Sequence, residues 1–136
     1  MISLSSLLET THIIPNLDYS HLFQVIAKIS VNRREDIQEA YKRMCFNVLY
    51  GNKDDHGKNF AFIYDENKKG YCLSPFYDIT KSYHKVEHEM TVNGNGRPTE
   101  KNLLEMAKKL ELSFDDCEKV INHIKEILKN QNSLML

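Results

Sequence analysis

One long amphipathic pattern constrains the fold more than any other feature of this chain. Over residues 33–50, apolar side chains return at the spacing of one helix face, and Gly51 follows directly. Because glycine readily adopts the left-handed conformation that ends helices, the pattern predicts a helix over 33–50, with Asn32 as its N-cap. The apolar face consists of Ile37, Ala40, Tyr41, Met44, Cys45, Val48 and Leu49.

Three further helices are expected on the same grounds. The first covers residues 19–30, with Asp18 or Ser20 as N-cap, and the second follows the N-cap candidate Thr99. The third opens at Ser113, where Asp116 stands in place of the usual Glu of a capping box. Residues 130–136 are expected to fray. The apolar positions of the last two helices are Leu103, Leu104, Met106, Ala107, Leu110, Cys117, Val120, Ile121, Ile124 and Leu128.

The pattern changes after Gly51. Residues 60–64 are aromatic and β-branched, 65–70 are turn formers, and 71–73 are apolar again, which predicts a hairpin. Residues 93–96, Asn-Gly-Asn-Gly, predict a loop. The forty-odd residues before the motif at 46–60 read as helices. The expected fold is therefore mainly α, with one short β-hairpin.

Composition limits the class of protein. A length of 136 residues fits a single domain over 1–136, and 41% hydrophobic residues suffices for one modest core. A net charge of −1 does not favour direct binding to nucleic acid or to an anionic membrane. Three cysteines without a CxxC pair predict neither a disulfide framework nor a zinc site. No signal peptide or membrane span is evident, so a cytoplasmic protein is expected.

Polar residues with phosphoryl-transfer chemistry flank the predicted hairpin. Asp54 stands five positions before Asn59, and Asp78 follows the hairpin, which is the order of the catalytic base and two magnesium ligands in protein kinases. Asp54 would orient and deprotonate the acceptor hydroxyl. Asn59 would bind one magnesium, and Asp78 would bridge metal and phosphates.

Two neighbouring residues join this candidate site. Lys58 can reach a phosphate oxygen as a point charge, so it is a candidate for both catalysis and cofactor binding. His56 can donate a hydrogen bond that holds the loop backbone beside the cofactor, or can be a plain loop residue. The same Asp-, Asn- and Gly-rich run also suits a polar turn, and spacing alone leaves both readings open. The helix before it, the hairpin after it and the Pro-aromatic-aromatic-Asp segment together favour a site.

Three segments resemble one known family. Residues 46–60, FNVLYGNKDDHGKNF, resemble the catalytic stretch of the HipA-like serine/threonine kinases, which are bacterial toxins of toxin–antitoxin systems. Residues 73–79, LSPFYDI, are similar to the metal-binding segment of that family, and residues 90–94, MTVNG, resemble its short Asn-Gly loop. The resemblance implies a mainly helical C-terminal kinase lobe that uses Mg²⁺ and ATP. It assigns Asp54 as the catalytic Asp, and Asn59 and Asp78 as metal ligands.

The resemblance also implies partners. Members of the family phosphorylate protein serine or threonine, including that of aminoacyl-tRNA synthetases, and a helix-turn-helix antitoxin holds them in check. Complete members carry an N-terminal lobe with a phosphate-covering loop and a nucleotide-binding Lys. This chain shows neither, since its first glycine is Gly51 itself. By itself it is therefore expected to bind ATP weakly or not at all.

Three readings remain open from the sequence. The chain is a fragment of a longer toxin, one half of a kinase whose N-terminal lobe is a separate chain, or a non-catalytic remnant that acts as a protein-binding or regulatory module. A metal-dependent phosphoesterase is a weaker alternative, because a two-metal hydrolase needs more ligands. A docking lobe predicts an exposed apolar patch at Leu22, Phe23 and Ile26, whereas a self-sufficient module predicts that this face is buried.

Overall fold

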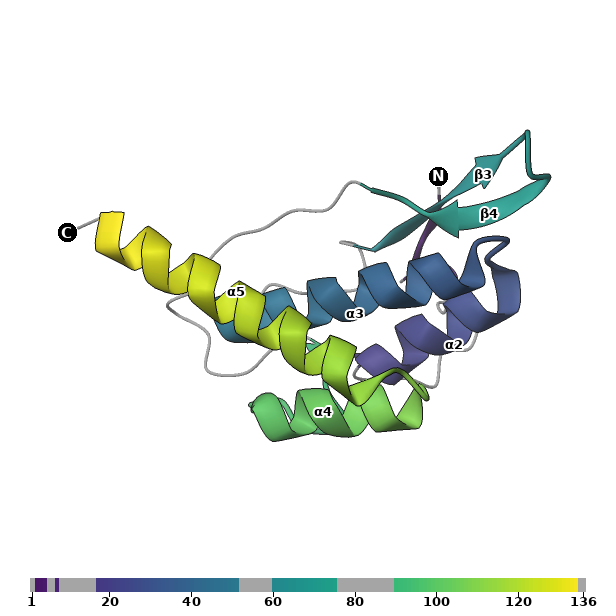
Figure 1. Cartoon of the computed structure of the whole chain (residues 1–136). Coiled ribbons are helices and arrows are strands. Elements are labelled where there is room, and N and C mark those ends of the chain that lie inside the picture. The colour runs from purple at the N-terminus through teal and green to yellow at the C-terminus, as the bar shows by residue number, and fades with distance from the viewer. Residues whose placement is uncertain (1, 5–6, 8–16, 52–59, 76–89, 135–136) are drawn as a thin grey trace.

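A computed structural model describes residues 2–4, 7, 17–51, 60–75 and 90–134 (Figure 1). Within these ranges the chain forms four helices and five short strands. The helices are α2 (Tyr19–Ile29), α3 (Arg33–Tyr50), α4 (Glu100–Lys109) and α5 (Phe114–Leu134). The strands are β1 (Ile2–Ser3), β2 (Leu17–Asp18), β3 (Ala61–Asp65), β4 (Gly70–Leu73) and β5 (Met90–Thr91).

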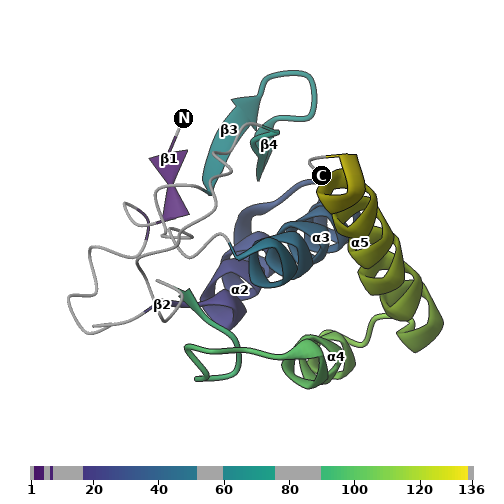
Figure 2. The same ribbon diagram turned by 90° about the vertical axis from the view of Figure 1, so that its left-hand side faces the viewer.

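Helix α3 lies at the centre of the molecule. It contacts α2, α4 and α5, and the β3–β4 hairpin packs on the α2–α3 pair. Figures 1 and 2 show the hairpin on one side of this pair and α4 on the opposite side. The mainly helical fold with one hairpin that the sequence predicts is therefore confirmed.

The predicted helix ends agree closely with the structure. Helix α3 covers the predicted range, and Gly51 follows it with a φ of 88°, in the left-handed region. Asp18 is the N-cap of α2, because its side chain accepts a hydrogen bond from the Ser20 amide. Thr99 caps α4 as predicted, and its amide donates to the Asn102 side chain at 2.9 Å. Local capping chemistry thus fixes the helix ends.

Several sequence expectations were wrong in detail. The first part of the chain is not wholly helical, because β1 pairs antiparallel with β3 and β2 pairs parallel with β5. A two-residue strand is too short to show an alternating pattern, so only its distant partner defines it. Asn32 occupies the N-cap position of α3 but makes no side-chain capping bond there. Helix α5 continues to Leu134, through most of residues 130–136, which were expected to fray.

The core lies between the helices and the inner face of the hairpin. The apolar face of α2 is fully internal, since Leu22, Phe23 and Ile26 are 0%, 2% and 0% exposed. The exposed patch expected for a docking lobe is therefore not present on this face. The largest fully buried side chains are Tyr19, Tyr41, Phe23, Phe60, Phe62, Leu4, Leu22, Ile26, Met44, Met90, Leu103 and Met106.

The Asn-Gly loop is a tight turn. Val92 and Asn95 exchange two main-chain hydrogen bonds of 3.0 Å each. Asn93 and Gly94 between them have φ values of 51° and 81°. Two successive positive φ values suit the type I′ turn for which Asn-Gly is the preferred pair. The loop predicted at residues 93–96 is confirmed.

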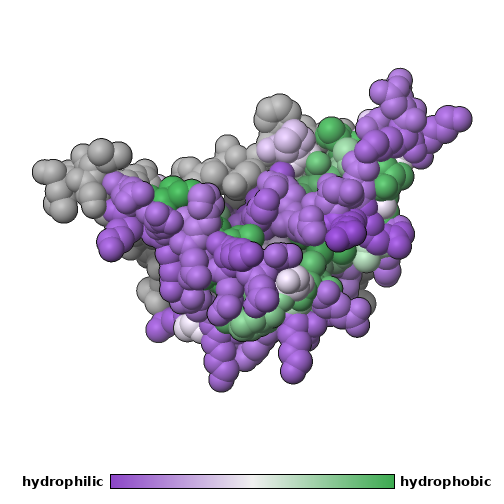
Figure 3. Space-filling view, viewed as in Figure 1, coloured by the Kyte–Doolittle hydropathy of each residue, from purple (hydrophilic) through white to green (hydrophobic). Residues whose placement is uncertain are grey.

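Strand β4, at the edge of the hairpin, contacts the turn between α2 and α3, where the Val31 amide donates to the Tyr71 carbonyl at 2.9 Å. Figure 3 shows a mainly hydrophilic surface over α5, with apolar side chains gathered toward the hairpin and this turn, where Val31 is 44% exposed. A Cβ added to Gly70 would lie 2.0 Å from Cγ1 of Val31. Glycine is therefore required at residue 70 by the close approach of Val31.

Gly70→Ala is expected to lower the free energy of unfolding by about 1–2 kcal/mol, because the added methyl group overlaps Val31. Urea unfolding of both proteins measures the difference. In a Val31→Ala background the obstructing γ-methyl is gone, so the same substitution should cost much less. An equal cost in both backgrounds would contradict the proposed clash.

Candidate functional site

All five predicted site residues lie outside the described part of the chain. They are Asp54, His56, Lys58, Asn59 and Asp78. The first four belong to residues 52–59, and Asp78 belongs to residues 76–89. The structure does describe the residues on both sides of each segment. These flanking residues therefore show which contacts hold the chain on either side of the two segments.

The two segments adjoin the same end of the hairpin. The amide of Ser74 donates to the carbonyl of Ala61 at 2.7 Å, directly beyond the register in which Phe62 lies opposite Leu73. Ala61 follows the first segment closely, and Ser74 precedes the second. Their hydrogen bond therefore joins the described chain just after the first segment to the described chain just before the second.

Two buried charged side chains of α3 hold the main chain at the start of the second segment. A carboxylate oxygen of Asp36 accepts from the Leu73 amide at 2.8 Å and from the Ser30 hydroxyl at 2.6 Å. The guanidinium of Arg43 donates through Nη2 to the Ser74 carbonyl at 2.7 Å. Asp36 and Arg43 are 8% and 2% exposed. Both contacts fix strand β4 and its continuation to α3.

The first segment is also held at both ends. Gly51 ends α3 with its amide bonded to the Asn47 carbonyl at 3.1 Å. The side-chain amide of Asn47 donates to the Tyr19 hydroxyl at 3.0 Å, and the Tyr19 ring meets Phe60 edge to face at 5.8 Å. The Phe60 carbonyl accepts from the Leu4 amide at 2.8 Å. A buried series of polar and aromatic contacts thus connects Gly51 and Phe60, the described residues on either side of 52–59.

Asp18 holds the chain just after the second segment. Its carboxylate accepts hydrogen bonds from the Thr91 hydroxyl and from the Gly94 and Ser20 amides. Burial alone would raise the pKa of Asp18, but these hydrogen bonds together outweigh it and lower the pKa below its ordinary value. The ionised carboxylate therefore links the start of α2 to the Asn-Gly turn.

Sequence reasoning missed the supporting roles of Asp36, Arg43 and Asn47. Charged and amide residues on a long helix usually face solvent, so their types indicated nothing special. The available signal was their spacing. Asp36, Arg43 and Asn47 fall on the same helix face as Ala40, which is buried.

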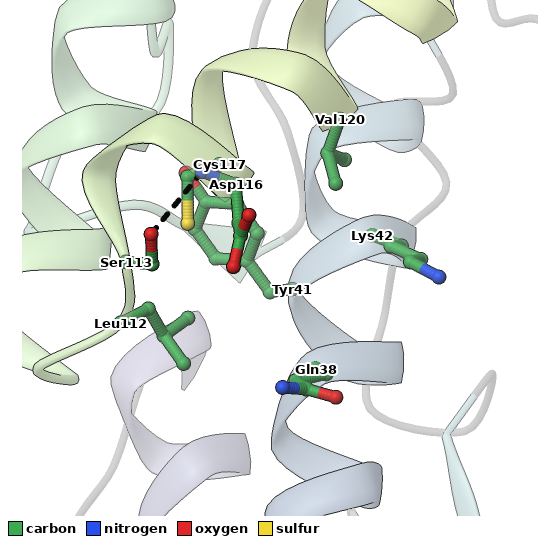
Figure 4. Close-up of a pocket in the computed structure, with 8 residues that line it drawn as sticks. All are labelled: Gln38, Tyr41, Lys42, Leu112, Ser113, Asp116, Cys117 and Val120. Atoms are coloured by element: carbon green, nitrogen blue, oxygen red, sulfur yellow. Dashed lines mark hydrogen bonds between the residues drawn. The ribbon is translucent and has the colours of Figure 1, made fainter.

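A hollow between α3 and α5 is separate from these supports (Figure 4). Its volume is about 230 Å³, and its residues are Gln38, Tyr41, Lys42, Leu112, Ser113, Asp116, Cys117 and Val120. The Tyr41 hydroxyl donates to the Leu103 carbonyl at 2.7 Å, and burial raises the pKa of Tyr41. Burial likewise raises the pKa of Cys117, and it raises that of nearby Cys45 to about 12. The two thiols therefore stay protonated and are poor nucleophiles.

The sequence profile of the HipA-like C-terminal domain matches residues 1–131. This chain belongs to that family. The resemblance drawn from the three sequence motifs is thereby confirmed. The HipA-like domain is also similar to two proteins of Sinorhizobium fredii. It is 29% identical over 83 residues to "Putative kinase Y4mE" and 35% identical over 85 residues to "Putative kinase Y4dM".

These matches cover 60% and 57% of this chain but only 19% and 20% of the two relatives. The chain thus spans about a fifth of the curated relatives that it matches. A solved structure from Shewanella oneidensis, of a toxin–antitoxin system comprising HipA, HipB and operator DNA, has the same fold. The TM-score is 0.73 at 23% identity, over 94% of this chain and 32% of that one.

The described residues of the HipA-like domain show two further features. They contain no group of three or more His, Cys, Asp or Glu side chains that could hold a metal ion. Among them, too, no helix combines the length and apolarity that crossing a bilayer requires.

Proposed function

We propose that this domain is the C-terminal lobe of an ATP-dependent protein serine/threonine kinase of a toxin–antitoxin system. The observation that carries the proposal is the Ser74–Ala61 hydrogen bond, together with family membership. Asn59 lies two residues before Ala61, and Asp78 lies four residues after Ser74. Since each residue spans at most about 3.6 Å, chain connectivity keeps both side chains within about 15–20 Å of this bond.

The residues in these segments suit the proposed chemistry. Asp78 and Asn59 offer the carboxylate and amide oxygens that Mg²⁺ prefers, so the donor set fits this metal. Magnesium and ATP, when bound, would supply charge neutralisation and the transferable phosphoryl group. Asp54 orients the hydroxyl of a serine or threonine and accepts its proton. Lys58 contributes a positive charge toward phosphate oxygens, and His56 holds the loop backbone beside them.

The proposed kinase needs further parts. An N-terminal lobe, on this chain's full-length protein or on a separate chain, would cover the phosphates and the adenine. The proposed partners are a helix-turn-helix antitoxin and a protein substrate such as an aminoacyl-tRNA synthetase. The fold shared with HipA, whose solved complex contains HipB, supports the antitoxin as a proposed partner. With a net charge of −1, any DNA contact is assigned to the antitoxin.

The second candidate is a non-catalytic, protein-binding module. The burial of Leu22, Phe23 and Ile26 favours it, because a self-sufficient module was expected to bury this face. A docking lobe would have to use another surface. In the module, substitution of Asp54 or Asp78 would leave partner binding intact.

Calorimetric titration of this chain with Mg·ATP tests the kinase proposal. Weak binding is expected, and Asp78→Ala should abolish it by removing the proposed metal ligand. Asp115→Ala is the matched control, since it removes the same charge from an exposed position on α5. Binding that survives Asp78→Ala would contradict the assigned metal site. No binding by the unsubstituted chain would exclude kinase activity of this chain alone.

A further inference from the structure

A trough runs along the contact between α3 and α5. The hollow of about 230 Å³ between these helices adjoins a second one of about 220 Å³, and Lys42 and Val120 line both. The second hollow is lined by Phe46 on α3 and by His123 and Ile124 on α5. Residue numbers increase together along both walls, because the two helices run in the same direction (Figure 1). The two hollows therefore form one continuous feature, the α3–α5 trough.

The apolar lining continues past the second hollow. The Phe46 ring stacks on Tyr50 with a centroid distance of 5.1 Å. On the opposite wall Ile127, one turn after His123, is 47% exposed. From Gln38 to Tyr50, α3 covers about 18 Å at 1.5 Å per residue. A contiguous apolar surface of this kind commonly marks an interaction site.

The dimensions of the trough suit a helix better than a small molecule. Each hollow is smaller than the usual small-molecule pocket of about 300–1,000 Å³. Two adjoining hollows can instead each take one large apolar side chain. A helix presents such side chains on one face at a spacing of four residues, or about 6 Å. A trough of about 18 Å corresponds to about three turns of a bound helix.

Lys42 indicates the charge of the partner. It is exposed between the two hollows, and it forms no ion pair with any residue that the structure describes. Figure 4 shows its ammonium group pointing away from Asp116, which lies in the first turn of α5, where the helix dipole favours a carboxylate. The Glu39 carboxylate is already paired with Arg43 at 3.3 Å. Lys42 can therefore pair with a carboxylate of a bound partner.

We propose that the α3–α5 trough binds an amphipathic helix of a partner protein that carries an acidic residue beside its apolar face. Two large apolar side chains of that helix fill the two hollows, and its carboxylate pairs with Lys42. Burial of the apolar side chains supplies most of the affinity, while the charge pair selects acidic helices over basic ones. This binding surface is independent of the proposed kinase chemistry.

NMR titration of the ¹⁵N-labelled chain with two synthetic peptides tests the proposal. The first peptide is a capped, alanine-based helix of about fifteen residues, with two leucines four positions apart and a glutamate three positions after the first leucine. The second has lysine in place of that glutamate. The glutamate peptide should bind about fivefold more tightly than the lysine peptide, and it should shift the amide signals of Lys42, Val120 and His123.

Three variants identify the groups responsible. Lys42→Glu should reverse the preference, so that the lysine peptide binds more tightly than the glutamate peptide. Lys119→Glu is the matched control, because it makes the same change at an exposed position of α5 that lines neither hollow, and it should leave the preference unchanged. Val120→Gln puts a polar amide between the hollows and should weaken binding of both peptides at least about tenfold. Val120 is only half-buried, so this variant should stay folded, which its NMR spectrum verifies.

Several results would overturn the proposal. One is that neither peptide binds at about 1 mM. Another is that the preference persists in Lys42→Glu, or that it changes equally in Lys119→Glu. Sedimentation of the chain without peptide tests a different occupant. Self-association that Val120→Gln abolishes would show that a second copy of this chain fills the trough, and the proposed acidic partner helix would then be wrong.

Discussion

If the proposed kinase function holds, Asp54→Asn in the full-length protein is expected to slow phosphoryl transfer by roughly 10²- to 10⁴-fold. An amide of the same size can still hydrogen-bond the acceptor hydroxyl but cannot take its proton. Affinity for Mg·ATP should change little, because Asp54 is assigned to the acceptor and not to the metal. Single-turnover transfer of labelled phosphate to protein measures the rate.

Asp55→Asn is the matched control for this prediction. It removes the same charge one position along the chain, from a residue that is given no role in the site. Equal losses of transfer rate in the two variants would show that the rate depends on the net charge of this segment. Asp54 would then not be the specific base. Full activity of Asp54→Asn would show that Asp54 does not act as a base in the reaction.

The largest stability effect is expected at Asp18. Asp18→Ala removes the N-cap of α2 and the acceptor for both Thr91 and Gly94. Loss of a cap costs about 1 kcal/mol, and each lost hydrogen bond to a carboxylate adds a similar amount, so a loss of about 2–3 kcal/mol is expected. Urea unfolding at neutral pH measures it. A loss below 0.5 kcal/mol, about the effect of an ordinary surface change, would contradict the linking role.

The same carboxylate makes stability depend on pH. Because its pKa is lower in the folded chain than the ordinary value of 3.8, the unfolded chain binds the proton more readily. The stabilisation is therefore complete well above pH 3.8 and is lost as the pH falls through the lower, folded-state pKa. Asp18→Asn cannot titrate. Its stability deficit should be full at pH 7 and should shrink in acid, and a deficit that stays constant over this range would contradict the assignment.

Local signals in the sequence sufficed for the helices and the hairpin. Gly51 marks the end of α3 because a left-handed residue is needed there, and Asn93-Gly94 marks a turn because both residues take positive φ. Thr99 marks the start of α4 by capping chemistry. Each of these signals is complete within a few neighbouring residues, so no knowledge of the rest of the fold is required.

Features that depend on distant partners could not be predicted in this way. Strands β1, β2 and β5 have two residues each, and Asp36 and Arg43 are buried where they bond the main chain of Leu73 and Ser74, 37 and 31 positions away. Strand pairing is not visible in the local pattern, and the burial of Asp36 and Arg43 is indicated there only by their spacing along the face of α3 that carries Ala40. The site residues themselves were found by motif spacing, and their roles remain predictions for the experiments above to decide.

The parallel pairing of β2 with β5 has a consequence for the order of folding. Asp18 and Thr91 are 73 positions apart, and closing a loop of that length costs about 4 kcal/mol of chain entropy. During synthesis, α2, α3 and the hairpin emerge first and can pack through contacts nearer in sequence. The Asp18 contact must wait until Thr91 has left the ribosome. Both segments assigned to catalysis lie inside this loop, so a nascent chain that stops before β5 contains their residues but lacks the β2–β5 pairing that closes the loop.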